Sequence, residues 1–201
     1  MKRGEPYHKE NLRETLIEAA VGLVGEVGPR AFTLREVARR AGVSHNAPYR
    51  HFAAKDDLLA AVAEEGFARL TASMRKWMRS GAGALERLQL SGCGYVDFAL
   101  RWPNHYQVMF DLPLASLVER MKNPTYGEAF DVLLDCIRAA QESGELPAGD
   151  PMPQALTCWS LMHGISKLSG NGNLGMTRAA TLKFVRKATD ILIEGLAHAK
   201  P

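Results

Sequence analysis

The sequence has no apolar run of about 18 residues, the length that a membrane-spanning helix requires, so we expect no transmembrane segment. The basic start of the chain is not followed by an apolar stretch, which argues against a secretory signal. Cysteines are few. Cys93, Cys136 and Cys158 lie far apart and match neither a disulfide framework nor the spacing of zinc ligands. We interpret them as buried thiols and expect a cytoplasmic protein.

Catalytic patterns are also missing. There is no glycine-rich phosphate loop and no Gly-x-Ser-x-Gly elbow. Cys158 and His163 lie five residues apart, so a helix would turn them about 140° away from each other. His8, His45 and His51 have no carboxylate at metal-ligand spacing on a shared face. We therefore predict no catalytic residue, no metal site and no cofactor, and an all-helical enzyme is the least favoured alternative.

Charge is spread unevenly along the 201 residues. The net charge of the chain is +3, and 46% of its residues are hydrophobic, which is enough for a core. Residues 1–55 hold ten Lys and Arg against six Asp and Glu, whereas the remainder is close to neutral. Three of the six histidines also lie in this first quarter. This distribution favours local binding of a polyanion, although a basic solvated face is the simpler alternative.

Strand-like alternation is absent, and apolar residues recur every three and four positions, which predicts an all-α fold of about nine to ten helices. We divide the chain into a three-helix unit at 1–55, with a linking helix at 55–80, and a larger helical domain at 56–201. The predicted helices span 9–27, 33–41, 44–51, 55–80, 84–102, 104–111, 114–122, 125–143, 153–169 and 177–198.

Local signals in residues 33–51 predict two short helices joined by a tight turn, a helix-turn-helix. Thr33 and Glu36 form a capping box, and Gly42 supplies a left-handed turn residue. We expect Ser44 to cap the second short helix, which makes Pro48 its fourth residue. A proline there is tolerable in a first turn and tightens it toward 3₁₀ geometry.

The side chains of this unit suit DNA. His45 and Asn46 are expected at the start of the second short helix, where base edges of a major groove are met. Ala47 is small enough to let the backbone approach, or to touch a thymine methyl. Thr33 and Arg35 stand at the start of the previous helix, where the helix dipole favours a phosphate. The alternative for His45 and Asn46 is that they are simply exposed polar residues.

The stretch "TLREVARRAGVSHNAPYRHFAAKDDLLAAV" resembles the DNA-binding part of the TetR-type (tetracycline-repressor) transcriptional regulators, and the resemblance covers residues 10–65. Its signature positions are occupied by Tyr49, His51, Phe52, Lys55 and Leu58. The resemblance implies phosphate contacts by Thr33, Tyr49, His51 and Lys55, and base reading by His45, Asn46, Ala47 and Arg50; with Arg35 and Ser44 these are our predicted DNA-binding residues. Packing against helix 9–27 is the alternative role for Tyr49. Pro48 departs from the family pattern.

The larger domain also carries a resemblance. "PNHYQVMFD" at 103–111 and "WSLMHGIS" at 159–166 resemble a TetR C-terminal subtype named for a Trp…His-Gly (WHG) motif, here Trp159, His163 and Gly164. Large aromatic and methionine side chains make adaptable apolar cavities. We predict ligand contacts by Phe98, Trp102, Met109, Phe110, Met121, Trp159 and His163, and the alternative is that these residues are core. For His163 the alternative is a structural hydrogen bond.

The helices at 153–169 and 177–198 carry apolar residues on two faces, which indicates a dimerisation pair in a four-helix bundle. The family resemblance implies a homodimer that binds a palindromic double-stranded DNA operator. We expect a repressor released from that operator by a small apolar or amphipathic effector, with no membrane partner. In the alternative, the C-terminal domain binds a protein partner and no small molecule.

Overall fold

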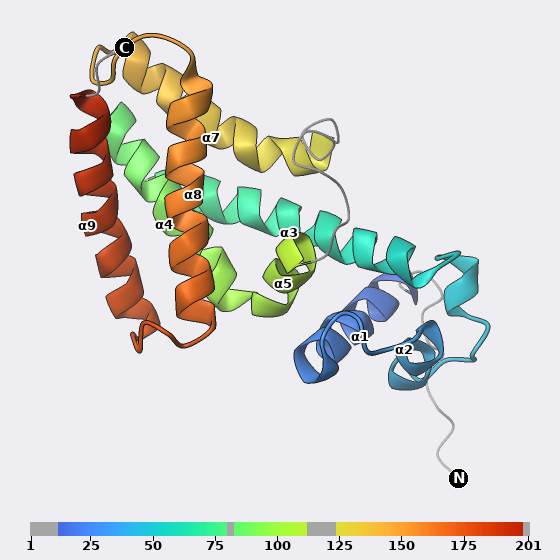
Figure 1. Cartoon of the computed structure of the whole chain (residues 1–201). Helices are drawn as coiled ribbons and strands as arrows, with labels where there is room; N and C mark the ends of the chain where they lie inside the picture. The colour runs from blue at the N-terminus through green and yellow to red at the C-terminus, as the bar shows by residue number, and fades with distance from the viewer. Residues whose placement is uncertain (1–11, 80–82, 112–123, 199–201) are drawn as a thin grey trace.

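The computed structural model describes residues 12–79, 83–111 and 124–198, and these residues are helical, with no strand among them. These described residues form eight α-helices and one 3₁₀ helix, which confirms the predicted all-α fold (Figure 1). The helix expected at 114–122 lies outside the described residues. The elements are α1 (Leu12–Val27), α2 (Leu34–Arg40), η2 (Pro48–Arg50), α3 (Lys55–Met78), α4 (Ala84–Arg101), α5 (Pro103–Asp111), α7 (Pro124–Glu142), α8 (Pro151–Gly170) and α9 (Arg178–Ala197).

The short helices at the N-terminal end are set by local signals. Glu36 N donates to Thr33 Oγ1 at 3.3 Å, and Thr33 N donates to Glu36 Oε2 at 2.7 Å, which confirms the capping box that begins α2. Gly28 ends α1 and Gly42 ends α2, both with positive φ, a conformation that glycine adopts without steric cost. Pro29 follows Gly28 and cannot continue α1.

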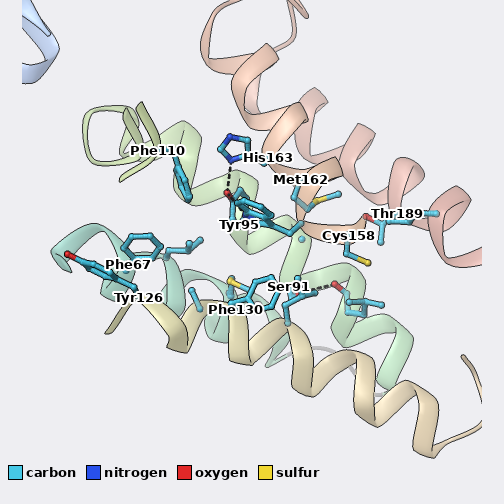
Figure 2. A pocket seen from close by; sticks show the side chains of 18 residues that line it. Phe67, Ser91, Tyr95, Phe110, Tyr126, Phe130, Cys158, Met162, His163 and Thr189 are labelled. Atoms are coloured by element: carbon cyan, nitrogen blue, oxygen red, sulfur yellow. Dashed lines mark hydrogen bonds between the residues drawn. The ribbon is translucent and has the colours of Figure 1, made fainter. Parts of the chain in front are cut away.

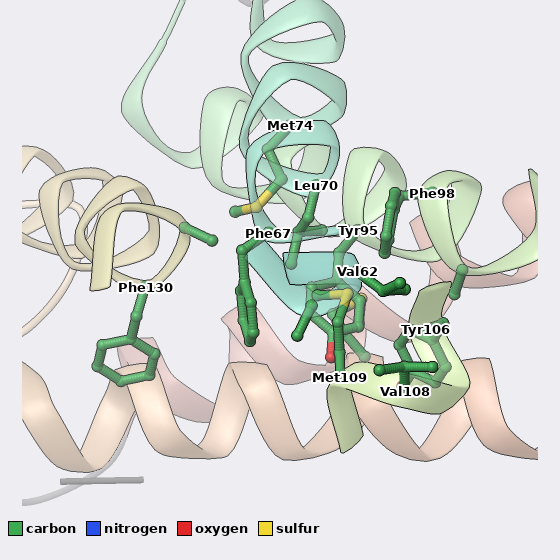
Figure 3. Close-up of a cluster of buried hydrophobic side chains, with 14 of the residues drawn as sticks. Val62, Phe67, Leu70, Met74, Tyr95, Phe98, Tyr106, Val108, Met109 and Phe130 are labelled. Atoms are coloured by element: carbon green, nitrogen blue, oxygen red, sulfur yellow. The ribbon is translucent and has the colours of Figure 1, made fainter. Parts of the chain in front are cut away.

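Helix α3 joins the two parts of the molecule. It runs from the N-terminal unit of α1, α2 and η2 into the bundle formed by α4, α5, α7, α8 and α9 (Figure 1). It packs against α4, α5 and α7 through a buried apolar cluster (Figure 3). Leu70, Phe98 and Met109 are among the side chains of that cluster that solvent scarcely reaches. This cluster holds the long helix in a fixed position relative to the bundle.

Two glycines let α4 approach its neighbours. A Cβ atom at Gly94 would lie 2.6 Å from Met74 Cα in α3, and one at Gly92 would lie 2.8 Å from Met162 Sδ in α8. Ser73 Oγ donates to the Gly94 carbonyl at 2.8 Å across the closer of these contacts. The sequence "SGCGY" therefore marks the place where α4 is packed from two sides.

Helices α8 and α9 lie side by side at the end of the bundle away from α1 and α2 (Figure 1). Each buries one face, with Cys158 and Met162 in α8 and Val185 in α9. A second face of α9 exposes Phe184 and Ile191, the latter by 72%. Within one chain these helices are thus buried on one side only. Among the described residues, no helix is long and apolar enough to cross a membrane.

Candidate functional site

The segment predicted as the second short helix is only partly helical. Residues 44–47 form a turn, closed by a hydrogen bond of 2.9 Å from Ala47 N to Ser44 O. The 3₁₀ helix η2 follows, with Ala47 as its N-cap and Pro48 as its first residue. Two expectations are therefore wrong: Ser44 does not cap the helix, and Pro48 is its first residue and not its fourth. Proline suits a first position because its fixed φ is helical and its missing N–H has no partner there.

Most of the predicted DNA-binding residues lie on the surface of the N-terminal unit. The exposed ones are Thr33, Arg35, Ser44, His45, Asn46, Tyr49, Arg50 and His51. Ala47 is buried, so its methyl group packs inside the unit, which argues against the thymine contact and leaves close approach of the backbone to DNA as its predicted role. Phe52, one of the signature positions, is buried.

Two of the expected phosphate-binding side chains already have intramolecular partners. Lys55 Nζ donates to the Arg30 carbonyl at 2.9 Å and lies 4.6 Å from the centre of the Phe32 ring. The Thr33 hydroxyl donates to Glu36 Oε2 at 2.9 Å within the capping box. A phosphate contact by either side chain would have to share or replace these bonds. Tyr49, in contrast, is 51% exposed, so its ring is not fully packed against α1, which was the alternative role for this residue.

The basic surface of this unit is largely unneutralised. Arg35, Arg39 and Arg50 are exposed and form no ion pair with any residue that the structure describes. Arg40 is different, because its guanidinium bonds to Glu26 Oε2 at 2.7 Å and holds the pKa of that carboxyl below its ordinary value. The unpaired arginines produce the positive potential that attracts a polyanion.

A cavity of about 320 Å³ lies within the larger domain, between α3, α4, α5, α7, α8 and α9 (Figure 2). Aromatic, methionine and leucine side chains make up most of its wall. Its volume lies at the lower end of the range of about 300–1,000 Å³ that small-molecule sites occupy. The lining residues are Phe67, Leu70, Met74, Leu88, Ser91, Gly92, Tyr95, Phe110, Tyr126, Ala129, Phe130, Leu133, Cys158, Trp159, Met162, His163, Thr189 and Leu192.

One end of the cavity carries a hydrogen-bonded group of side chains. Tyr95 Oη lies 3.1 Å from His163 Nδ1 (Figure 2), and Tyr106 Oη lies 2.8 Å from the same nitrogen. Trp159 Nε1 donates to Tyr95 Oη at 3.3 Å. Phe110 packs edge-on against the His163 ring, with ring centres 4.9 Å apart. His163 therefore makes the structural hydrogen bonds of our alternative interpretation and also lines the cavity.

The predicted ligand-contacting residues divide into three groups. Phe110, Trp159 and His163 line the cavity. Phe98 and Met109 are fully buried in the core and do not line it, and Trp102 is half-buried beside Arg69 at a separate surface hollow. These three predictions are corrected, because the buried faces of α4 and α5 extend beyond the cavity. Met121 lies outside the described residues.

Sequence reasoning missed several lining residues, notably Tyr95, Phe67 and Phe130. Tyr95 follows the glycines of "SGCGY", and the need of a buried tyrosine for a hydrogen-bond partner is the signal that would have singled it out. Burial raises the pKa of Tyr95 well above its ordinary value and raises that of the Cys158 thiol to about 11, so both groups stay protonated. In the parts of the chain that the structure describes, no group of three or more metal-ligating side chains exists.

A helix-turn-helix with a basic surface, carried on a helical domain with an internal cavity, defines a DNA-binding regulator. Residues 16–62 match the family described as bacterial regulatory proteins, tetR family, and residues 88–192 match the tetracyclin repressor-like C-terminal domain. The chain belongs to the TetR family of transcriptional regulators, which are not enzymes. The narrower resemblance to the Trp…His-Gly subtype stays a prediction.

Individual relatives extend this finding. An HTH-type transcriptional repressor of Mycobacterium tuberculosis is 36% identical over 70 residues, which are 35% of this chain and 37% of that one. The transcriptional activator FasR of Mycolicibacterium smegmatis is 28% identical over 110 residues, 55% of this chain and 50% of that one. The chain thus spans between a third and a half of the length of these curated relatives. A Rhodococcus sp. RHA1 protein described as of unknown function has a solved structure with a TM-score of 0.81 and 32% identity, covering 97% of this chain and all of that one.

Proposed function

We propose that the protein is a homodimeric, cytoplasmic repressor that leaves a palindromic operator when a small molecule enters its cavity. The observation that carries this proposal is the physical link between the cavity and the DNA-binding unit. Helix α5 contributes Phe110 to the cavity wall, and its Asn104 Nδ2 donates to the Val21 carbonyl of α1 at 3.1 Å. A ligand that displaces α5 therefore acts directly on α1.

The DNA contacts are proposed for the exposed predicted residues. His45 and Asn46 lie in the turn before η2 and reach base edges, whereas Arg35, Tyr49 and His51 contact phosphates. In a dimer the two units enter major grooves about 34–36 Å apart, one turn of DNA. This geometry requires a palindromic operator.

The dimer interface is proposed on the outer faces of α8 and α9. Leu168, Phe184 and Ile191 are large apolar residues that solvent reaches on these helices. Gly164 in α8 has no atom of a neighbouring element within 4 Å of the position of a Cβ. A glycine in a helix interior reduces stability by about 1 kcal/mol relative to alanine, so close approach of a partner helix would account for it.

The cavity favours a small-molecule effector over a protein partner for the C-terminal domain. A sealed core would have favoured the protein partner, whereas a cavity of about 320 Å³ suits a small molecule. The effector lowers DNA affinity by its differential affinity for the two protein conformations, typically about 1–3 kcal/mol. The sign of regulation is tested by a reporter fused to the selected operator in cells with and without the gene.

The DNA-binding claim is tested by selecting the bound DNA from a random pool and titrating the selected operator at several salt concentrations. We expect log affinity to fall steeply with log salt, by about 0.9 for each phosphate contact. Arg35→Ala should remove about one phosphate contact per protomer, and the fall of log affinity with log salt should become less steep accordingly. Arg138→Ala, on the exposed surface of α7, is the matched control and should leave the slope unchanged. A slope near zero for the unaltered protein would refute DNA binding.

A further inference from the structure

A second hollow, open to solvent, lies where α3 packs against α4. Its volume is about 380 Å³. Among the described residues it shares none of its lining with the internal cavity, so a molecule bound here would occupy a different site. Cationic and indole side chains make up much of its wall. The lining residues are Arg69, Ala72, Ser73, Lys76, Trp77, Asp97, Arg101 and Trp102.

Asp97 is the acidic group of this hollow, and both of its carboxylate oxygens already accept hydrogen bonds. Its side chain is only 6% exposed. Trp77 Nε1 donates to Oδ2 at 3.1 Å, Arg101 Nε donates to Oδ1 at 3.2 Å, and Arg178 Nε of α9 donates to Oδ1 at 2.6 Å. One carboxylate balances one guanidinium. One of the two arginines therefore keeps a positive charge that Asp97 does not neutralise.

Two further cations line the hollow. Arg69 pairs with Glu65, and its guanidinium lies 5.6 Å from the centre of the Trp102 ring. Lys76 is exposed and forms no ion pair or hydrogen bond with any residue that the structure describes. Of the four cationic side chains in or beside the hollow, two are matched by the carboxylates of Glu65 and Asp97. Two positive charges remain, which favours an anion.

The two indoles supply the apolar part of the wall. Trp77 and Trp102 are both half-buried, so part of each ring remains accessible to a molecule in the hollow. The bond from Trp77 Nε1 to Asp97 fixes the position of that indole. Aromatic rings pack well against indoles, and ammonium and guanidinium groups form strong hydrogen bonds with carboxylates and phosphates. The hollow thus combines the two features that an aromatic anion requires.

We propose that this hollow binds a small aromatic anion, whose carboxylate or phosphate group reaches Lys76 and Arg101 and whose ring packs against the two indoles. An anion suits this open site because water still reaches its charge, which keeps the cost of desolvation low. The site does not rest on the proposed function, since it is separate from the internal cavity and from the DNA-binding unit.

The test uses 4-nitrobenzoate and 4-nitrophenyl phosphate as anionic probes, and the uncharged 4-nitrobenzamide as a control of similar shape. Nitroaromatic rings quench tryptophan fluorescence on contact. The chain has three tryptophans, and in the Trp159→Phe variant the remaining two, Trp77 and Trp102, both line the hollow. Saturable quenching therefore reports binding there. At least one anion should bind about three- to tenfold more tightly than the amide.

Charge variants identify the residue that holds the anion. Lys76→Gln should weaken binding of the better anion by about two- to fivefold and leave the amide unchanged, whereas Lys76→Arg should retain the affinity. Arg138→Gln is the matched control, because it removes one positive charge from the exposed surface of α7 and should change nothing. Isothermal titration calorimetry of these variants with Trp159 in place gives the same comparison, and circular dichroism checks that each variant folds.

The proposal is overturned if the amide binds as tightly as both anions, if Lys76→Gln and Arg138→Gln give the same affinity for the better anion, or if neither anion quenches saturably. It is also overturned if inorganic phosphate displaces the better anion at an equal concentration, since the ring would then contribute nothing. These measurements contain no DNA. A failure here leaves the operator titration and the proposed repressor function untouched, and a failure of the operator titration leaves this site untouched.

Discussion

Gly94→Ala tests whether the close approach of α3 and α4 is required for the fold. The added Cβ would lie 2.6 Å from Met74 Cα, 2.9 Å from Met74 N and 2.9 Å from Ser73 O. All three are backbone atoms, so no change of rotamer can relieve the contact. Because carbon atoms prefer separations of about 3.5–4.0 Å, the two helices must move apart by about 1 Å. Such a shift also strains the hydrogen bond from Ser73 Oγ to the Gly94 carbonyl.

The size of the effect follows from three contributions. Overpacking a well-packed core costs about 1–3 kcal/mol, and loss of the Ser73 hydrogen bond costs about 1 kcal/mol. Replacing glycine by alanine inside a helix stabilises the folded state by about 1 kcal/mol. We therefore expect Gly94→Ala to lower the free energy of unfolding by about 2 kcal/mol.

Urea denaturation followed by circular dichroism, at one fixed protein concentration, measures this change. Gly170→Ala is the control, because Gly170 lies in α8 on the side away from Leu168 and a Cβ there meets no atom of a neighbouring element within 4 Å. The control should raise the free energy of unfolding by about 0.5–1 kcal/mol. If Gly94→Ala unfolds at the same urea concentration as the unaltered protein, or at a higher one, the steric reasoning is refuted.

Three further predictions concern the cavity, its link to α1 and pH. Gly92→Ala meets only the flexible end of Met162, so stability should change little, while calorimetry should show that a molecule found to release the protein from its operator binds roughly tenfold more weakly. Asn104→Ala removes the bond to Val21 and should leave ligand affinity unchanged, while operator titrations with and without ligand show about threefold weaker coupling. Burial lowers the pKa of His105 below 6.5, although a nearby carboxylate opposes this. The unfolded chain therefore takes up the proton first as pH falls, so stability should drop between about pH 7 and pH 5, and urea denaturation of His105→Gln should show a smaller drop.

The sequence predicted the N-terminal unit well because its determinants are local. The capping box of Thr33 and Glu36 and the left-handed Gly42 act within three or four residues, and the structure confirms both. Apart from the helix predicted at 44–51, the bounds of the predicted helices that fall on described residues agree with the structure to within a few residues. Proline and glycine act on their own backbone, so Pro103 and Pro151 mark where α5 and α8 begin.

The segment after Gly42 was less predictable because two local preferences compete there. Ser44 favours an N-cap, but Pro48 favours the first position of a helix, and these positions cannot both be satisfied. The structure follows Pro48, which leaves Ser44 to Ala47 as a turn and places Ala47 inside. The 3₁₀ geometry that we expected around the proline is confirmed.

The cavity was harder to predict because no single segment contains it. Its wall comes from six helices, and the face of a helix that looks into it differs little in composition from the face that looks into the core. Phe98 and Phe110 are equally apolar, yet Phe98 is fully buried in the core while Phe110 lines the cavity. Only the packing of distant segments decides between these two outcomes.

Helix α5 shows why the motif "PNHYQVMFD" has a role beyond packing. Asn104 and Phe110 are six residues apart, a rise of about 9 Å along the helix, so one short rigid element touches both α1 and the cavity. The Asn104 amide is held closely, since a Cβ at Gly25 of α1 would lie 2.5 Å from its Nδ2. In the proposed mechanism, a ligand that displaces α5 as a whole therefore moves α1, and with it the DNA-binding unit, or breaks the Asn104 bond.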